Sequence, residues 1–203
     1  MFVMYTPFHK PCSSSPFYLF PSFFSLCSPL FSFVLRYGCS YSYMKHSIMS
    51  NETVEMMPPL LEDLIDRLVS TGVLPRSKRP NSAIINVYSE GDCIPPHIDH
   101  HDFDRPFCTV SMLSTQNMVL GTKIKIINEG QFAGAESISL LRRSCLVLDG
   151  NGADVAKHCV PSVTQERVSI TFRCMQKKWS KEIEQKQWFR DMEYEAKEGK
   201  SRF

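Results

Sequence analysis

His97 and Asp99 are the residues whose types and spacing best suit chemistry, and they lie in the run Ile-Pro-Pro-His-Ile-Asp-His-His-Asp. On an extended segment, side chains two residues apart project to the same side of the backbone. An imidazole and a carboxylate at this spacing can therefore bind one cation. A third ligand from a distant strand would complete a set of two histidines and one carboxylate, which leaves adjacent positions open on Fe(II).

His158, 59 residues after Asp99, is the best candidate for the third ligand. It follows the turn-rich run Gly-Asn-Gly-Ala-Asp, which suits the presentation of a side chain at the mouth of a strand. A His-x-Asp pair also occurs by chance, and a lone histidine usually packs or points to solvent. Surface histidines therefore remain the alternative to a metal site.

Residues 167–173, Arg-Val-Ser-Ile-Thr-Phe-Arg, alternate in polarity and predict a strand. Arg167 and Arg173 would share one face of it. Two arginines on an inward face require an anionic partner, because an unpaired buried charge is costly. A dicarboxylate co-substrate beside the metal would supply that partner, since arginine binds carboxylates with bidentate geometry. The alternative is a solvated edge strand.

Residues 82–88 also predict a strand, on which Asn86 and Tyr88 lie two apart on one face. Both side chains can donate hydrogen bonds to carboxylate oxygens. Ordinary strand residues are the alternative, because tyrosine is common in strands.

The order of these elements resembles the AlkB family of Fe(II)/2-oxoglutarate dioxygenases, and most closely its plant branch related to RNA N6-methyladenine demethylases. The resemblance covers residues 37–175. The segments that carry it are Asn86–Tyr88, Gly91–Asp99, Asp102–Ser111, Gly150–Pro161 and Arg167–Arg173.

The resemblance implies a role for each site residue. Iron would be held by His97, Asp99 and His158. The co-substrate 2-oxoglutarate would be held by Asn86, Tyr88, Arg167 and Arg173, with Arg167 at its distal carboxylate. The family's nucleotide-facing segment would correspond to Tyr37–Tyr41.

The resemblance also implies an activity. With Fe(II), 2-oxoglutarate and O2, such an enzyme would demethylate N-methylated bases in single-stranded RNA, above all N6-methyladenine in mRNA. Formaldehyde, succinate and CO2 would be released. A catalytically impaired RNA-binding or interaction module with the same fold is the alternative. An oxygenase of proteins or small molecules and a zinc hydrolase fit the motifs less well.

Composition sets limits on partners and location. The formal net charge is only +2, so the nucleic-acid partner rests on the resemblance and not on charge. The eight cysteines form no close Cys-x-x-Cys pair and no secreted disulfide framework. We therefore expect a reducing cytoplasmic or nuclear location.

Residues 1–36 form an atypical segment rich in apolar residues, serine and proline. Its run 16–35 carries no charge and has about the length of a membrane span. Three prolines interrupt helical propagation in it, so no stable membrane association is expected, with an anchor or signal as the alternative. We interpret the segment as the unusual amino end of a truncated family member.

The remaining elements predict a mainly β fold with flanking helices. Residues 58–72 indicate an amphipathic helix that prolines open and Gly72 closes. Its expected apolar stripe is Leu60, Leu61, Leu64, Ile65, Leu68 and Val69. Short strands at about 82–88, 107–113, 122–127, 137–141, 144–148 and 167–173 favour a double-stranded β-helix, or jelly roll. Residues 176–203 predict a charged helical tail, with Trp179 or Trp188 docking on the domain.

Overall fold

The computed structural model describes residues 2–5, 33–42, 47–52 and 54–197 of the chain. Most of the predicted segment 1–36, including most of its apolar run 16–35, therefore lies outside the described residues. In the part of the chain that is described, no helix is long and apolar enough to cross a membrane.

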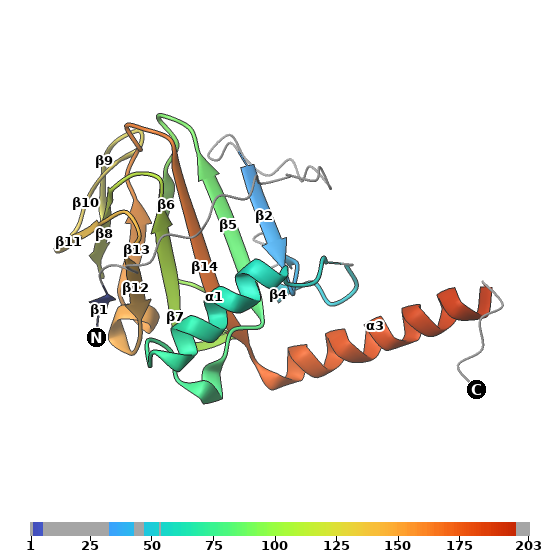
Figure 1. The fold of residues 1–203 in the computed structure, drawn as a ribbon. Helices are drawn as coiled ribbons and strands as arrows, with labels where there is room; N and C mark the ends of the chain where they lie inside the picture. The colour runs from blue at the N-terminus through green and yellow to red at the C-terminus, as the bar shows by residue number, and fades with distance from the viewer. Residues whose placement is uncertain (1, 6–32, 43–46, 53, 198–203) are drawn as a thin grey trace. The chain divides into compact units, whose positions relative to one another are not determined.

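Two β-sheets dominate the fold, and they confirm the predicted jelly roll (Figure 1). The larger sheet has the strand order β1 (Phe2–Tyr5), β12 (Cys145–Leu148), β7 (Phe103–Met112), β14 (Arg167–Met175), β5 (Ser82–Tyr88) and β2 (Phe33–Tyr37). The smaller has the order β11 (Glu136–Leu140), β8 (Gln116–Gly121), β13 (Lys157–Val160) and β6 (Ile94–His97). Two short ribbons pair β9 (Lys125–Asn128) with β10 (Gln131–Ala133) and β3 (Tyr41–Ser42) with β4 (Ser47–Ile48).

Contacts divide the chain into two compact units. Unit 1 comprises Met1–Leu35, Ile85–Ile98 and Cys108–Thr171, and unit 2 comprises Arg36–Ile84, Asp99–Phe107 and Phe172–Phe203. Unit 1 contains the whole four-stranded sheet and the short helix α2 (Asn151–Asp154). Unit 2 contains α1 (Pro59–Ser70), the 3-10 turn η1 (Arg76–Lys78), the β3–β4 ribbon and α3 (Lys177–Lys197).

The predicted strands agree with the structure except around Gly121. We expected a strand over residues 122–127, whereas β8 ends at Gly121 and β9 begins only at Lys125. Gly121 is the last residue of β8, and a Cβ at this position would lie 3.0 Å from the backbone nitrogen of Ala135. The glycine therefore marks a close approach of two backbone segments rather than a break.

Helix α1 has nearly the predicted boundaries and buries half of the predicted stripe. Pro59 occupies its first turn, and Gly72 follows its end with a positive φ of 76°. The buried residues of the helix are Leu61, Ile65 and Leu68. Leu60 was wrongly assigned to the stripe, since it is 56% exposed. At 100° per residue it lies about a quarter turn outside the arc of the other three.

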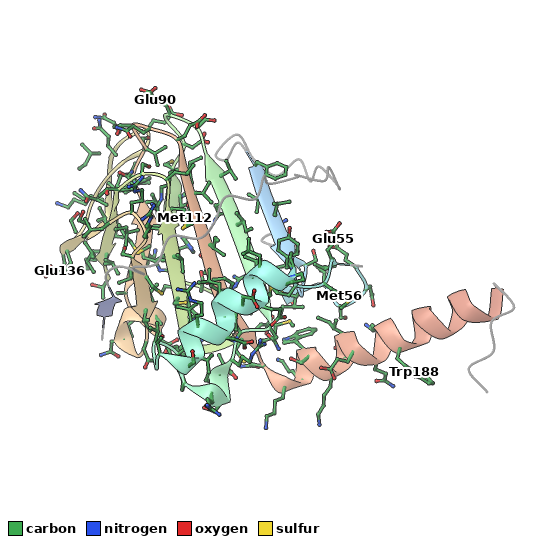
Figure 2. All side chains as sticks on the ribbon, viewed as in Figure 1. Glu55, Met56, Glu90, Met112, Glu136 and Trp188 are labelled. Atoms are coloured by element: carbon green, nitrogen blue, oxygen red, sulfur yellow. The ribbon has the colours of Figure 1, made fainter. Side chains whose placement is uncertain are left out.

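Within unit 2, the first turns of helix α3 pack against a buried cluster. The buried cluster of Cys39, Tyr41, Ile48, Phe103 and Met175 receives Trp179 and Ile183 from the helix. The side-chain amide of Asn81 donates to the Ser180 hydroxyl over 2.9 Å and adds a polar contact at the same place. Of the two tryptophans proposed to dock, Trp179 does so, and Trp188 is 53% exposed (Figure 2).

The buried stripe of α1 gives a matched stability test. Ile65→Ala should lower the free energy of unfolding by about 2–5 kcal/mol, because it leaves a cavity at a fully buried site. Leu60→Ala on the same helix should change it by less than about 0.5 kcal/mol. Urea denaturation followed by circular dichroism measures both, and equal losses for the two variants would contradict the assignment of the buried face.

Candidate metal centre

His97 and His158 face each other across two neighbouring strands. The antiparallel pairing of β6 and β13 places the two residues opposite one another, and their ring centroids lie 4.3 Å apart. β6 contains Pro95 and Pro96, which lack an N–H donor, and it lies at the edge of its sheet. The strand register therefore brings together two imidazoles that are far apart in the sequence.

Asp99 joins the two histidines although it lies beyond the end of β6. The strand ends at His97, so Asp99 is not on the extended segment that the His-x-Asp spacing suggested. One ligand atom from each of the three side chains nevertheless lies within 4.8 Å of the other two. The structure thus brings together the three residues that the sequence singled out as metal ligands.

The hydrogen bond of His97 fixes which ring nitrogen faces a metal. Its Nδ1 lies 2.8 Å from the main-chain oxygen of Pro95, which can only accept, so Nδ1 carries the proton and donates. Nε2 is then the nitrogen that presents a lone pair. Cys159 follows His158 on β13, so its side chain projects to the opposite face of the strand, and burial raises the pKa of its thiol to about 11.

The carboxylate of Asp99 is also held by an arginine. Nη1 of Arg173 lies 3.5 Å from Oδ2 of Asp99, and both side chains are almost buried. The guanidinium of Arg173 stacks on the ring of Phe103, at 3.8 Å from its centroid. One of the two inward arginines therefore has its anionic partner within the chain, which the strand pattern did not reveal.

Arg167 is a buried cation in a different situation. It is 1% exposed, and its neighbours are the Ser111 hydroxyl at 3.1 Å and the ring of Tyr88 at 5.7 Å. Burial lowers the pKa of its guanidinium, and Tyr88 opposes that shift. Among the described residues no carboxylate pairs with it, and its buried Nε has no hydrogen-bond partner. Arginine remains protonated in proteins, so this position suits an anionic ligand.

Polar side chains on neighbouring strands of the larger sheet also pair with one another. Tyr88 on β5 shares a hydrogen bond of 3.2 Å with Ser169, and Thr171 lies 3.3 Å from Thr109 on β7. Asn86, two residues before Tyr88, is half-buried on the same strand. Ser111 was missed by the sequence analysis. Its signal was a hydroxyl two residues after Thr109, on the same face of β7.

The donor chemistry of the triad fits Fe(II). Two imidazole nitrogens and one carboxylate oxygen form the set that non-haem Fe(II) oxygenases use, and it leaves coordination positions for a co-substrate and O2. The buried, carboxylate-free guanidinium of Arg167 fits an acidic co-substrate equally well.

Comparison with known proteins agrees with this chemistry. A family model described as the 2OG-Fe(II) oxygenase superfamily matches residues 25–173. The protein named RNA demethylase ALKBH9B from Arabidopsis thaliana is 49% identical over 147 residues, which are 70% of this chain and 29% of that protein. RNA demethylase ALKBH10B from the same organism is 37% identical over 65% of this chain and 24% of its own length.

Animal proteins are also similar. RNA demethylase ALKBH5 from Bos taurus is 34% identical over 58% of this chain and 30% of its own length. The chain thus spans less than a third of each of these three relatives. A solved structure, "The structure of OsALKBH1", has a TM-score of 0.49 at 13% identity over 69% of this chain and 77% of that one, a likeness too weak to carry an argument.

The triad predicts a metal affinity that depends on particular ligands. The purified protein should bind Co(II), a spectroscopic substitute for Fe(II), and His97→Gln or Asp99→Asn should weaken binding by more than about 100-fold, since each removes a ligand. His101→Gln is the matched control, because His101 is exposed and lies outside the triad. Absorption titration measures the affinities. If all three variants bind as the wild type does, the triad is not the metal site.

Proposed function

Because this chain belongs to the 2OG-Fe(II) oxygenase superfamily, we propose that it is a 2-oxoglutarate-dependent dioxygenase that demethylates RNA, with N6-methyladenine in mRNA as its substrate. The observation that carries the proposal is the convergence of His97, Asp99 and His158. The substrate class is supported by relatives named RNA demethylases. A cytoplasmic or nuclear location, where mRNA is found, belongs to the same proposal.

Each residue of the metal centre has a part in this function. His97 and His158 would each contribute an imidazole nitrogen, and Asp99 a carboxylate oxygen, to hold Fe(II). Bound iron, together with 2-oxoglutarate and O2, would supply the oxidation of an N-methyl group. Arg173 would hold the Asp99 carboxylate in place through their contact of 3.5 Å.

Arg167 would bind the distal carboxylate of 2-oxoglutarate. The carboxylate would neutralise a cation that is already desolvated and would accept from its buried Nε. The Tyr88 hydroxyl is the second donor proposed for this co-substrate. Asn86 and Arg173 are assigned to it as well, by the family motif. A zinc hydrolase would give Arg167 no comparable partner.

The base must reach the metal centre outside a helical stack, so single-stranded RNA costs least to bind. Hydroxylation of the N-methyl carbon gives a hydroxymethyl adduct on the base, which releases formaldehyde, while 2-oxoglutarate becomes succinate and CO2. Tyr37–Tyr41 remains the proposed nucleotide-facing segment. Cys39 and Tyr41 are buried in the unit 2 cluster, so Tyr37 and Ser40, which are half-buried, are its more accessible members.

The proposed reaction is tested by its products. Protein loaded with Fe(II) and supplied with 2-oxoglutarate and O2 should form formaldehyde from single-stranded RNA containing N6-methyladenine and an equal amount of succinate from 2-oxoglutarate. Asp99→Asn should release neither, because the carboxylate ligand is lost. Unmethylated RNA and methylated DNA of the same sequence are the comparison substrates. RNA binding without product, in protein that holds iron, would reject the enzyme and favour an RNA-binding module.

The role of Arg167 is tested by the co-substrate. Arg167→Met should raise the apparent KM for 2-oxoglutarate roughly 10- to 150-fold, because a hydrogen bond to a charged group contributes about 1.5–3 kcal/mol. Arg142→Met, at an exposed arginine, is the matched control and should leave that KM unchanged. Succinate formation at increasing 2-oxoglutarate gives both values, and an unaltered KM in Arg167→Met would remove the assignment.

A further inference from the structure

Arg105 holds the loop that carries Asp99 through main-chain atoms. Its Nη2 donates to the carbonyl oxygen of Asp99 over 2.6 Å. Its Nη1 donates to the carbonyl oxygens of His100, over 3.2 Å, and of Phe103, over 2.7 Å. The guanidinium also lies over the ring of Phe107, at 5.3 Å from its centroid. One side chain on β7 therefore binds three carbonyls of the loop from Asp99 to Phe103.

The geometry of this contact restricts the loop. A guanidinium is planar and rigid, and its donors point in fixed directions. Three carbonyls that meet one guanidinium must therefore keep fixed positions relative to one another. An ammonium or an apolar side chain at the same place could not impose this arrangement, because neither presents a fixed fork of donors.

Asp99 is consequently held at two points by two different arginines. Arg173 contacts its carboxylate at 3.5 Å, whereas Arg105 binds its main-chain oxygen. Phe103 connects the two contacts, since its ring lies under Arg173 and its carbonyl accepts from Arg105. The side chain of Phe103 is buried, which anchors the far end of the loop.

We propose that Arg105 is a positioning residue for the metal centre. It is not one of the three clustered ligands, and it binds main-chain oxygens of the loop. By fixing the backbone of Asp99 beyond the end of β6, it sets where the carboxylate oxygen meets His97 and His158. Metal ligands must be placed to within about 0.5 Å. Asp99 lies beyond the end of β6, so the hydrogen bonds from Arg105, and not a strand pairing, fix the position of its backbone.

The inference rests on the proposed function, because it assumes that the triad binds Fe(II). It predicts that the main effect of losing Arg105 is a lower affinity for the metal ion. Arg105→Met keeps the length of the stem beside Phe107 and removes all three donors. It should weaken Co(II) binding about 10- to 100-fold, as is typical when the partner of a metal ligand is lost. Arg105→Lys keeps the charge without the fork and should fall between Arg105→Met and the wild type.

Arg79→Met is the matched control in the same unit. Arg79 forms surface ion pairs with Glu62 and Asp66, at 2.5 and 2.8 Å, and its hydrogen bonds go to these two carboxylates and to the main chain of Arg76. Its loss should leave Co(II) affinity unchanged. Thermal unfolding of the metal-free proteins, followed by circular dichroism, shows whether any change in affinity occurs in a folded protein.

The outcomes separate this inference from the proposed function. If the wild type binds no Co(II), or binds it independently of His97, the proposed metal centre fails whatever Arg105 does. If the wild type binds through His97 and folded Arg105→Met binds equally well, the positioning role is overturned and the metal centre stands. If Arg105→Met does not fold, Arg105→Lys decides by the same comparison. Failure of both to fold would assign Arg105 to stability alone and overturn the inference.

Discussion

The pairing register between β6 and β13 is the constraint on which the rest of the site depends. It places His97 opposite His158, so a change of one residue in the register would turn one imidazole to the other face of its strand. The remaining ligand is not placed by a strand, because β6 ends at His97. Asp99 depends instead on two arginines, one at its carboxylate and one at its main-chain oxygen. The two histidines are therefore placed by the pairing of β6 with β13, and the carboxylate is placed by side chains that bind its loop.

The two buried arginines differ in how their positive charge is neutralised. Arg173 is neutralised within the chain by Asp99, and Arg167 has hydroxyl and aromatic neighbours without a carboxylate among the described residues. An unpaired buried guanidinium is costly, so a protein that keeps one obtains the compensation from a ligand. In the proposed 2-oxoglutarate site, no carboxylate among the described residues neutralises Arg167, and the bound ligand would supply one. Ligand binding should stabilise the fold there as well as supply the co-substrate.

Much of the fold could be predicted from the sequence where the elements are long and periodic. Helix α1 has prolines at its start and a buried stripe, and β14 alternates in polarity over residues 167–173. β8 was missed because Asn117 and Gly121 obscure its pattern, and β6 because its two prolines argue against a strand. The three candidate ligands were found from residue type and spacing. Arg105 could not be found in that way, because a side chain that binds main-chain carbonyls leaves no pattern in its partners' identities.

The prolines of β6 have a consequence for the outer edge of the small sheet. Pro95 and Pro96 have no N–H groups to offer, so a foreign strand cannot form a regular hydrogen-bonded ladder along that edge. The strand that carries His97 is thereby protected from β-strand addition by another chain, whether in aggregation or in domain exchange. The same two prolines that make β6 hard to recognise in the sequence therefore limit the pairing of its outer edge with a second copy of the protein.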